Sequence, residues 1–415
     1  MQRRNFLTAL ASTASASVCL PSALFGAQRW PSWRGPDRNG YAPKEAWPTS
    51  LDDEHLKLQW SVALDDSYSG PIVNESHVFV TETINKKNES TRALKRDDGK
   101  QDWIIEWPGY MSVPFFAARN GSWIRSTPAT DGSQLFVGGI RDVLVSVDTA
   151  SGKENWRVDF AALAGGKVPD FGMACSPLVD GSHIYVQAGL GVHKLDAATG
   201  KVIWKSMGDD GNIMSSGAFS SPVIAELHGV RQLIVQTRTQ LAGINLESGE
   251  PLWKYEVAAF RGMNILTPTI WDNAIFTSSY GGRSLLLDVK VGDKWEPKVR
   301  WENKSEGYMS SPVVIDDHCY MHLRNRRFAC IDLKKGETTW TTRPYGEYWS
   351  MITNGQQILA LDHDGKLRLI QANPAKFELL SEREVSTEES WAHLALADGQ
   401  VFVRHQKGLD VYKWA

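Results

Sequence analysis

The segment SPLVDGSHIYVQAGLGVHKLDAATGKVIW, from Ser176 to Trp204, decides the fold of this chain. It alternates short apolar runs with turns at Asp180-Gly181, Gly189 to Gly191 and Thr199-Gly200. Glycine in such turns takes a positive φ without a Cβ clash, and a neighbouring Asp or Thr bonds the nearby backbone. The segment therefore predicts four short antiparallel strands, and so small a sheet buries its faces only if it is repeated.

Both ends of this unit recur along the chain. Six units end in a pattern of the form Asp-x-x-Thr-Gly-Lys-x-x-Trp, clearest before Trp156, Trp204, Trp253 and Trp340, shortened before Trp103 and reduced to the indole at Trp301; the seventh and eighth units have neither the Gly nor the Trp. The mean step between unit starts is about 46 residues, a period typical of solenoids and propellers. The eight starts are Pro71, Pro128, Pro177, Pro222, Pro268, Pro312, Met351 and Ala395.

This repeat resembles the tryptophan-docking repeat of pyrroloquinoline-quinone (PQQ) type β-propellers, a family that includes quinoprotein dehydrogenases and the outer-membrane assembly lipoprotein BamB. The resemblance covers roughly residues 55 to 414, and a motif that recurs at one period is more specific than a single match. It implies an all-β, eight-bladed β-propeller of four-stranded antiparallel blades. Seven blades is the alternative, if the unit at Met351 is not a blade.

The resemblance also implies that the repeated tryptophans dock against the neighbouring blade. An indole buries a large apolar area there while its N–H still reaches a carbonyl. The expected docking residues are Trp60, Trp103, Trp156, Trp204, Trp253, Trp301 and Trp340.

The two ends of the repeat region are incomplete in complementary ways. Leu56 to Leu64 is a predicted strand with no strands before it, whereas the last unit stops after a third strand at Leu409 to Lys413. We expect the strand of Trp60 to complete the last blade, because ring closure removes the exposed sheet edges that invite aggregation.

The first residues precede the fold. Arg3-Arg4-Asn5-Phe6-Leu7 resembles a twin-arginine export signal, and an Ala/Ser-rich segment without acidic residues follows it. We assign residues 1–27 to this signal, 28–54 to an extended leader strap anchored by Trp30 and Trp33, and 55–415 to the propeller. An exported, periplasmic protein without a lipid anchor is expected, because Val18 before Cys19 does not suit a lipobox.

Composition narrows the function classes. A net charge of −3 gives no footprint for nucleic acid, and no apolar stretch of the mature part approaches the length of a membrane span. The chain has no zinc-protease, nucleophile-elbow, phosphate-loop or C-x-x-C motif. Cys319 and Cys330 lie on adjacent predicted strands; we favour two buried thiols, with a disulfide as the alternative.

The loops that enter the innermost strands face the funnel of a propeller. Aromatic side chains with a few polar tips suit a small-molecule pocket. The same side chains also suit a narrow axial channel that is packed shut, the interpretation we favour from sequence. The candidate binding residues are Tyr68, Arg125, Met173, Phe219, Asn264, Tyr308, Glu347, Tyr348, Trp349 and His393.

Between Trp103 and Pro128 an aromatic-rich insertion interrupts the repeat. We expect it to form a lid over a ligand, a surface for a partner, or a plug that covers the end of the ring.

The resemblance leaves three functions open. The first is a monomeric, non-catalytic binding scaffold, similar to BamB, that offers its loops to an envelope protein or peptide and needs no cofactor. The second is a PQQ-dependent quinoprotein oxidoreductase with calcium, which we disfavour because the chain lacks the adjacent Cys-Cys pair of those enzymes. The third is a carbohydrate- or metabolite-binding sensor. We expect neither catalytic nor metal-binding residues.

Overall fold

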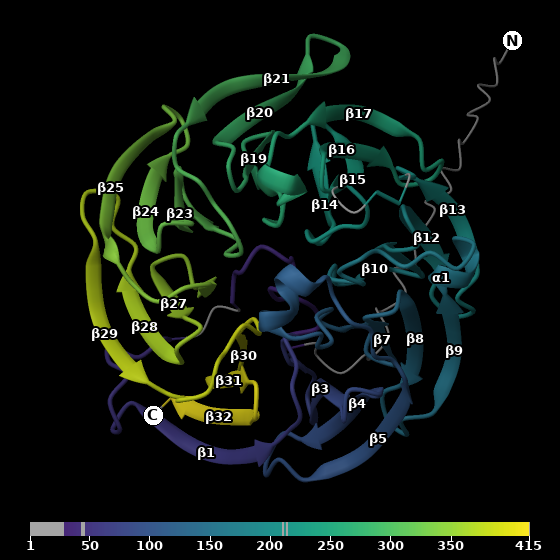
Figure 1. Cartoon of the computed structure of the whole chain (residues 1–415). Coiled ribbons are helices and arrows are strands. Elements are labelled where there is room, and N and C mark those ends of the chain that lie inside the picture. The colour runs from purple at the N-terminus through teal and green to yellow at the C-terminus, as the bar shows by residue number, and fades with distance from the viewer. Residues whose placement is uncertain (1–28, 43–45, 210, 213–214, 415) are drawn as a thin grey trace, which may run out of the picture.

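Eight blades surround a central axis in the computed structural model of this chain (Figure 1). The structure describes residues 29–42, 46–209, 211–212 and 215–414. Each blade is a four-stranded antiparallel sheet, and the unit that starts at Met351 forms one of them. The prediction of an all-β, eight-bladed propeller is therefore confirmed, and the seven-bladed alternative is wrong. The predicted export signal and the question of a lipid anchor concern residues outside those described.

The first four blades follow one another along the chain. Blade 1 contains β2 (Ile72–Val73), β3 (His77–Ile84), β4 (Asn88–Lys95) and β5 (Gln101–Pro108). Blade 2 contains β6 (Ala129–Thr130), β7 (Gln134–Gly139), β8 (Val143–Asp148) and β9 (Glu154–Asp159). Blade 3 contains β10 (Leu178–Asp180), β11 (His183–Gln187), β12 (Val192–Asp196) and β13 (Val202–Ser206). Blade 4 contains β14 (Val223–Leu227), β15 (Val230–Gln236), β16 (Gln240–Asn245) and β17 (Pro251–Glu256).

The remaining blades complete the circle. Blade 5 contains β18 (Thr269–Trp271), β19 (Ala274–Ser278), β20 (Ser284–Val291) and β21 (Lys294–Asn303). Blade 6 contains β22 (Val313–Ile315), β23 (His318–His322), β24 (Arg327–Asp332) and β25 (Glu337–Pro344). Blade 7 contains β26 (Ser350–Thr353), β27 (Gln357–Leu361), β28 (Lys366–Gln371) and β29 (Glu378–Glu384). Blade 8 contains β30 (Ala395–Ala397), β31 (Gln400–His405), β32 (Gly408–Trp414) and β1 (Leu56–Ala63).

The helical segments in the described part of the chain are short. They are η1 (Phe115–Asn120), α1 (Phe160–Leu163) and η2 (Phe260–Gly262). Among the described residues no helix has the length and apolar character needed to cross a membrane.

Both ends of the chain share blade 8, as predicted. Strand β1 pairs antiparallel with β32, in a register that runs from Leu56 opposite Trp414 to Ala63 opposite Gly408. The first strand of the propeller thus covers the edge that the last strand leaves open, and the circle closes through hydrogen bonds.

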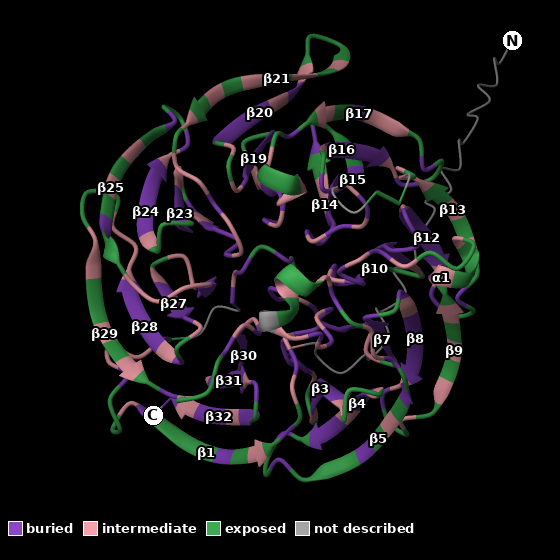
Figure 2. Cartoon of the chain, viewed as in Figure 1, coloured by how far each residue is buried: buried purple, intermediate pink, exposed green. Residues whose placement is uncertain are grey.

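Burial follows the position of a strand within its blade (Figure 2). The middle strands lie between two neighbouring blades, so both of their faces are covered, as in β8, whose central residues are all buried. The outermost strands lie at the rim and alternate between half-buried and exposed residues, as in β9. The apolar core is therefore divided among the interfaces between adjacent blades.

The docking tryptophans link each blade to the next. Six of their seven indole N–H groups donate to a carbonyl of the following blade, over N···O distances between 2.7 and 3.2 Å. In several blades the ring rests on the turn glycine of that next blade: a Cβ built on Gly200 would lie 2.6 Å from the ring of Trp156. The glycine in the repeated motif is therefore the residue against which the indole of the preceding blade packs.

Trp253 departs from this pattern. Its indole N–H donates to Gln232 Oε1 of its own blade, 2.8 Å away. Blade 5, which follows, lacks the motif glycine and instead has a long hairpin between β20 and β21. Because the next blade has no motif glycine for the indole to pack against, Trp253 remains buried but makes its hydrogen bond within its own sheet.

The leader residues 29–42 cross one end of the ring. Trp30 forms an antiparallel bridge with Val73 of blade 1, and Tyr41 forms a parallel bridge with Thr353 of blade 7. Between them, the N–H of Thr130 in blade 2 donates to the Pro31 carbonyl over 2.9 Å. This segment, called the strap below, connects blades that are far apart in the sequence.

Two buried arginines of the strap enter the axis of the propeller. Arg38 donates to the carbonyls of Pro222, Pro177 and Ser176 at 2.9, 2.7 and 3.0 Å, and Arg34 donates to the carbonyl of Pro312. Burial lowers the pKa of Arg34 to about 9 and that of Arg38 to about 10, so both stay charged at neutral pH. The strap thus closes the axial channel with backbone-bonded cations.

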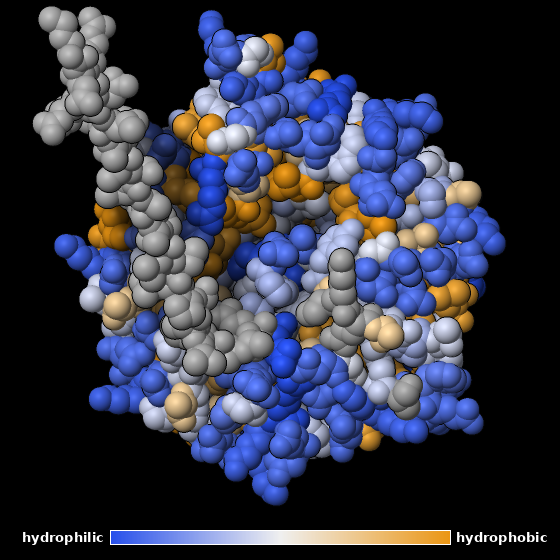
Figure 3. Space-filling model, turned by 180° about the vertical axis from the view of Figure 1, so that it is seen from behind, coloured by the Kyte–Doolittle hydropathy of each residue, from blue (hydrophilic) through white to orange (hydrophobic). Residues whose placement is uncertain are grey.

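The face that carries the strap lies opposite the one seen in Figure 1. Hydrophilic side chains dominate its rim, and apolar side chains gather toward its interior (Figure 3).

The three cysteines within the described ranges, Cys175, Cys319 and Cys330, are buried free thiols. Cys319 packs between blades 5 and 6, whereas Cys330 packs between blades 6 and 7, so the two side chains lie on opposite faces of one sheet. The prediction of two buried thiols is confirmed.

Candidate functional site

A cavity of about 330 Å³ opens at the end of the ring where the innermost strands begin. Its floor is formed by residues that directly precede those strands, such as Ser176 and Ser221, and by Trp33 of the strap. The strap itself bonds the far ends of the same strands, at Val73 and Thr353. The cavity, called the mouth below, is therefore open at one end and closed by the strap at the other. Segment η1 lies over the ring centre at this end (Figure 1).

One side of the mouth carries a continuous row of aromatic rings, called here the tyrosine arc. Successive ring centroids lie 5.1, 5.1, 6.0, 4.5 and 4.7 Å apart, within the range of favourable aromatic pairs. In order, the members of the arc are Phe260, Tyr280, Tyr308, Tyr348, Trp391 and Tyr68.

The backbone of Tyr348 is held at φ 52°, a left-handed conformation that a bulky residue rarely adopts. Such strain persists only where the surroundings hold the residue, and the ring of Tyr348 packs against those of Tyr308, Trp391 and His363. The tyrosine arc is thus preorganised at this position.

The other side of the mouth carries a phenylalanine arc, which consists of Phe115, Phe116, Phe171 and Phe219. Their successive centroids lie 5.6, 6.2 and 5.3 Å apart. Phe115 and Phe116 come from η1 in the aromatic insertion, and they are 90% and 50% exposed. The insertion therefore contributes a wall of the mouth and an apolar surface at its rim.

A ring of hydroxyl groups surrounds the floor of the mouth. The Thr or Ser that precedes the first strand of a blade accepts a backbone N–H from the adjacent blade, as in the 3.0 Å bond from Thr127 N–H to Ser176 Oγ. We call these residues the hydroxyl belt. They are Thr127, Ser176, Ser221, Ser311 and Ser350, with N···O distances between 2.8 and 3.1 Å.

Arg125 is the one charged side chain among the described residues that line the mouth. Its Nη2 donates to the Gly121 carbonyl at 3.2 Å, and its guanidinium lies 5.9 Å from the ring centroid of Tyr68. Its Nε is buried without a hydrogen-bond partner. Burial lowers the pKa of Arg125, with no carboxylate among the causes to offset that effect.

His393 lines the mouth in its neutral form. Its Nδ1 lies 3.1 Å from the Leu394 carbonyl, and its ring packs edge-on against Trp33 with centroids 5.7 Å apart. Burial and the charge of Arg34 lower the pKa of His393 to about 3. At neutral pH it adds no charge to the cavity.

Seven of the ten candidate binding residues lie together in the mouth: Tyr68, Arg125, Phe219, Tyr308, Tyr348, Trp349 and His393.

The other three candidates lie elsewhere. Met173 is buried in the core between blades 2 and 3. Asn264 is fully buried and uses its Nδ2 to bond the carbonyls of Arg238 and Val257, at 2.9 and 3.0 Å. Glu347 faces an adjacent hollow, where its Oε1 lies 3.8 Å from Arg326 Nη1. In each case the side chain makes its contacts outside the mouth, which the loop sequence did not reveal.

Several lining residues were absent from the candidate list. Trp33 arrives from the strap, Phe116 from the insertion and Phe171 from a loop. The hydroxyl belt did have a sequence signal, because a Ser or Thr directly precedes five of the repeated prolines: Pro128, Pro177, Pro222, Pro268 and Pro312.

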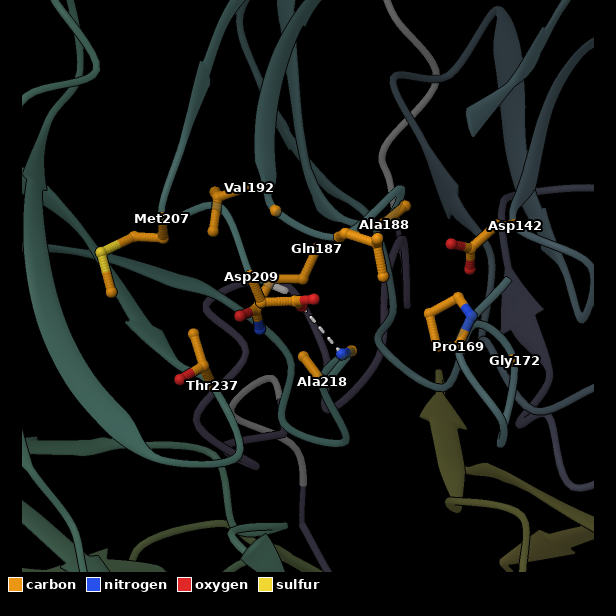
Figure 4. Close-up of a pocket in the computed structure, with 13 residues that line it drawn as sticks. Asp142, Pro169, Gly172, Gln187, Ala188, Val192, Met207, Asp209, Ala218 and Thr237 are labelled. Atoms are coloured by element: carbon orange, nitrogen blue, oxygen red, sulfur yellow. Dashed lines mark hydrogen bonds between the residues drawn. The ribbon is translucent and has the colours of Figure 1, made fainter. Parts of the chain in front are cut away.

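A second, much smaller cavity lies among blades 2, 3 and 4 (Figure 4). Asp142 Oδ2 accepts the Gly189 N–H at 2.8 Å, and Asp209 Oδ2 accepts the Gly217 N–H at 3.1 Å. Burial raises the pKa of Asp142 to about 7. The enclosed space of about 20 Å³ has room for no more than a water molecule. Of these two cavities, the mouth is therefore the candidate functional site.

The mouth does not fit PQQ held with a calcium ion. Calcium takes six to eight oxygen ligands, typically from carboxylates. No Asp or Glu is present among the described residues that line the mouth, and no cluster of three metal-ligating side chains occurs in the described part of the chain. The nearest acidic candidate residue, Glu347, pairs with Arg326 outside the cavity.

Comparison with known proteins gives a consistent family. A family model described as outer membrane protein assembly factor BamB matches residues 87–342. The outer membrane protein assembly factor BamB of Yersinia pestis is 18% identical over 422 aligned positions, which cover 98% of each chain.

Solved structures share the fold. The crystal structure of BamB from Moraxella catarrhalis superposes with a TM-score of 0.65 at 15% identity, covering 86% of this chain and 100% of that one. A quinohemoprotein alcohol dehydrogenase, ADHIIG from Pseudomonas putida HK5, gives a TM-score of 0.62 at 14% identity, covering 94% of this chain and 80% of that one. Because the family model spans more than half of the sequence, we conclude that this chain belongs to the family of the outer membrane protein assembly factor BamB.

Proposed function

We propose that this chain is an exported, non-catalytic binding scaffold of the cell envelope that holds a protein partner at its mouth. The observation that carries the proposal is the pair of aromatic arcs around a cavity whose described lining contains no carboxylate. Tyrosine and tryptophan provide large, rigid contact surfaces at a low entropic cost, as in antibody paratopes and interface hot spots. A surface of this kind is suited to binding.

The rim of the mouth favours a protein as the partner. Phe115 is 90% exposed on η1, and Phe260 is 47% exposed at the start of the tyrosine arc. Exposed aromatic side chains beside a preorganised cavity are typical of protein interaction sites. The relatives named as outer membrane protein assembly factors agree with a partner in the envelope. The twin-arginine-like signal agrees with export to the periplasm.

Site-specific photo-cross-linking in the intact envelope tests this proposal. A photoreactive phenylalanine analogue replaces Phe115 in one protein and Leu58, which is 53% exposed on β1 at the rim of blade 8, in the control protein. We expect position 115 to capture one or a few envelope proteins that position 58 does not. Capture from position 115 should drop severalfold with Tyr348→Ala, which interrupts the tyrosine arc. Equal capture from both positions would contradict the proposal.

A thermal-shift assay tests the quinoprotein alternative. Addition of PQQ and calcium to the purified protein should leave the Tm unchanged, because the mouth offers no ligands for the cation. A rise of several degrees would show that the folded state binds the cofactor and would overturn the non-catalytic assignment.

A further inference from the structure

The floor of the mouth contains hydrogen-bond donors without matching acceptors. Each hydroxyl of the belt accepts a backbone N–H, yet among the described residues none of the five donates its own proton to a neighbour. A hydroxyl carries one donor and two acceptor lone pairs, so each belt residue has a free donor. All five residues line the cavity: Thr127, Ser176, Ser221, Ser311 and Ser350.

The mouth also carries a positive charge that no carboxylate of its described lining balances. Arg125 makes a single hydrogen bond to a carbonyl, and no ion pair joins it to a carboxylate in the described part of the chain. On the strap side of the floor, Arg34 and Arg38 bond only carbonyl oxygens. A cation removed from water without a counter-ion is costly, so the field in the mouth favours an anion.

The amount of charge and the cavity walls narrow the class of anion. One guanidinium lines the cavity, which matches one negative charge, and a planar fork of N–H donors suits a carboxylate. The walls beside it are apolar: Phe171, Phe219 and Ile265 line the same cavity. A ligand that satisfies both features carries a carboxylate next to an apolar or aromatic group.

We propose that the mouth binds a terminal carboxylate that follows an apolar side chain, with Arg125 and the hydroxyl belt holding the carboxylate and the two aromatic arcs holding the side chain. The inference deepens the proposed function, since it names the part of the partner that enters the scaffold. Capture of a chain's terminal carboxylate is a recognised mode of peptide binding. The same chemistry is offered by a small aromatic carboxylic acid.

Isothermal titration of the full-length protein with matched probes tests the inference. The peptide acetyl-Ala-Ala-Phe is used with a free carboxylate and as its C-terminal amide. We expect the acid to bind at least ten times more tightly than the amide, because only the acid neutralises Arg125. The inference is overturned if neither this peptide nor the 3-phenylpropionate described below binds more tightly as the acid than as the amide.

Variants show whether Arg125 is responsible. Arg125→Met should reduce the preference for the acid to less than twofold, and Arg125→Lys should retain part of it. Arg324→Met is the matched control, because Arg324 stacks 4.1 Å over Tyr280 at the rim and pairs with Glu306, outside the mouth lining. Its preference for the acid should stay as in the unmodified protein. A full preference in a folded Arg125→Met protein would also overturn the inference.

A second pair of probes needs no variant and separates the two sources of the carboxylate. 3-Phenylpropionate and 3-phenylpropanamide differ in the same way as the two peptides. Tight binding of the peptide acid assigns the site to chain termini, whereas a preference seen only with 3-phenylpropionate assigns it to a small carboxylic acid; both results support the carboxylate site.

The two proposals fail independently. Cross-links from position 115 without any preference for the acid would leave the scaffold standing and remove the carboxylate site. A preference for the acid without such cross-links would do the reverse.

Discussion

Ser176 shows at the residue scale how the ring is held together at its axis. Its Oγ accepts the N–H of Thr127 from blade 2 at 3.0 Å, and its own N–H donates to Ser221 Oγ of blade 4 at 2.9 Å. A single residue, 2% exposed, thus joins three blades. Its hydroxyl satisfies a buried backbone donor that has no strand partner.

Replacement of Ser176 by Ala should lower the free energy of unfolding by about 1–3 kcal/mol, because the buried Thr127 N–H loses its acceptor. Chemical denaturation of the two proteins measures the difference. Ser182→Ala in the exposed turn of the same blade is the control and should change stability by less than about 0.5 kcal/mol. A similar small change at both positions would show that the belt does not stabilise the ring.

Glu89 is a second residue whose burial has a measurable consequence, in this case for the pH dependence of stability. It is fully buried on β4, where Oε1 accepts the Ile140 N–H at 2.9 Å and Oε2 accepts the Trp107 indole N–H at 3.1 Å. Burial raises the pKa of Glu89 to about 8 in spite of these bonds. In the unfolded chain the pKa of a glutamate is about 4.3, so between these values the folded state holds an extra proton.

The stability contributed by Glu89 is therefore complete below about pH 4 and is lost as the pH rises toward 8. The buried His193, His322 and His393 make stability depend on pH in the opposite direction, since burial lowers their pKa values to about 4, 3 and 3. Their contribution to stability is lost as the pH falls through these values. Their effect is complete above about pH 6.5, the pKa of an unperturbed histidine. Burial also raises the pKa of Asp142, to about 7, so its contribution to stability falls with rising pH as that of Glu89 does.

Between pH 7 and 8 the free energy of unfolding should therefore fall in the unmodified protein, by at most about 1.4 kcal/mol per unit for a single carboxyl. Glu89→Gln, which cannot titrate, should show a flatter dependence over this interval. Urea denaturation at several pH values measures both slopes. Indistinguishable slopes would mean that Glu89 ionises normally.

At the scale of the element, the repeated hairpin is a docking device for the preceding blade. The turn between β12 and β13 holds Gly200 at φ 71°, directly beneath the ring of Trp156. The indole N–H of Trp156 then donates to the Ala197 carbonyl of the same turn at 3.0 Å. The motif glycine thus serves both the turn conformation and the packing of a tryptophan about one repeat earlier in the chain.

Substitutions at two glycines of blade 3 separate the energy of the turn conformation from the energy of the tryptophan packing. Gly181→Ala places a Cβ in open space at φ 57°, whereas Gly200→Ala at φ 71° brings it to 2.6 Å from the ring of Trp156. Both variants should lose about 1–2 kcal/mol through the left-handed backbone. Gly200→Ala should lose about 1–3 kcal/mol more, because the indole must move. Thermal or chemical unfolding measures the difference, and equal losses would show that the indole contact carries no energy.

At the scale of the whole molecule, closure and the strap are separate levels of organisation. Strand β1 completes blade 8 by pairing with β32, which leaves the ring without an open edge. The strap then crosses the closed ring and bonds blades 1, 2, 3, 4, 6 and 7. We infer that closure determines whether the propeller folds and that the strap adds stability and a floor to the mouth.

Two truncations distinguish these levels. A chain that begins at Trp47 lacks the strap but keeps β1; it should remain a folded monomer with a Tm several degrees lower. A chain that begins at Asp65 also lacks β1, so the exposed edge of β32 should cause aggregation or loss of the fold. Circular dichroism and size-exclusion chromatography compare the two. A folded, monomeric chain from Asp65 would contradict the role of closure.

Much of the fold was predictable because its determinants are local and repeated. The alternation within β-strands, the turn glycines such as Gly200 and the indoles such as Trp156 recur at one period, which predicted eight blades and their closure through Trp60. The departure of Trp253 was not predictable in the same way, since it depends on the absence of the motif glycine from the next blade. Seven of the ten candidate residues reached the mouth because the loops before the innermost strands all end at the axis.

By itself, the sequence indicated eight blades with seven as the alternative, the positions of the repeated tryptophans and the loops that surround the axis, because these follow from the alternation, turns and period of short segments. Only the tertiary structure decided which side chains of those loops converge. It turned Met173 into the core and Asn264 onto the backbone, brought Trp33 from the strap, and left Arg125 without a counter-ion. The physical reason is that side-chain direction in an irregular loop depends on packing against segments that are distant in the chain.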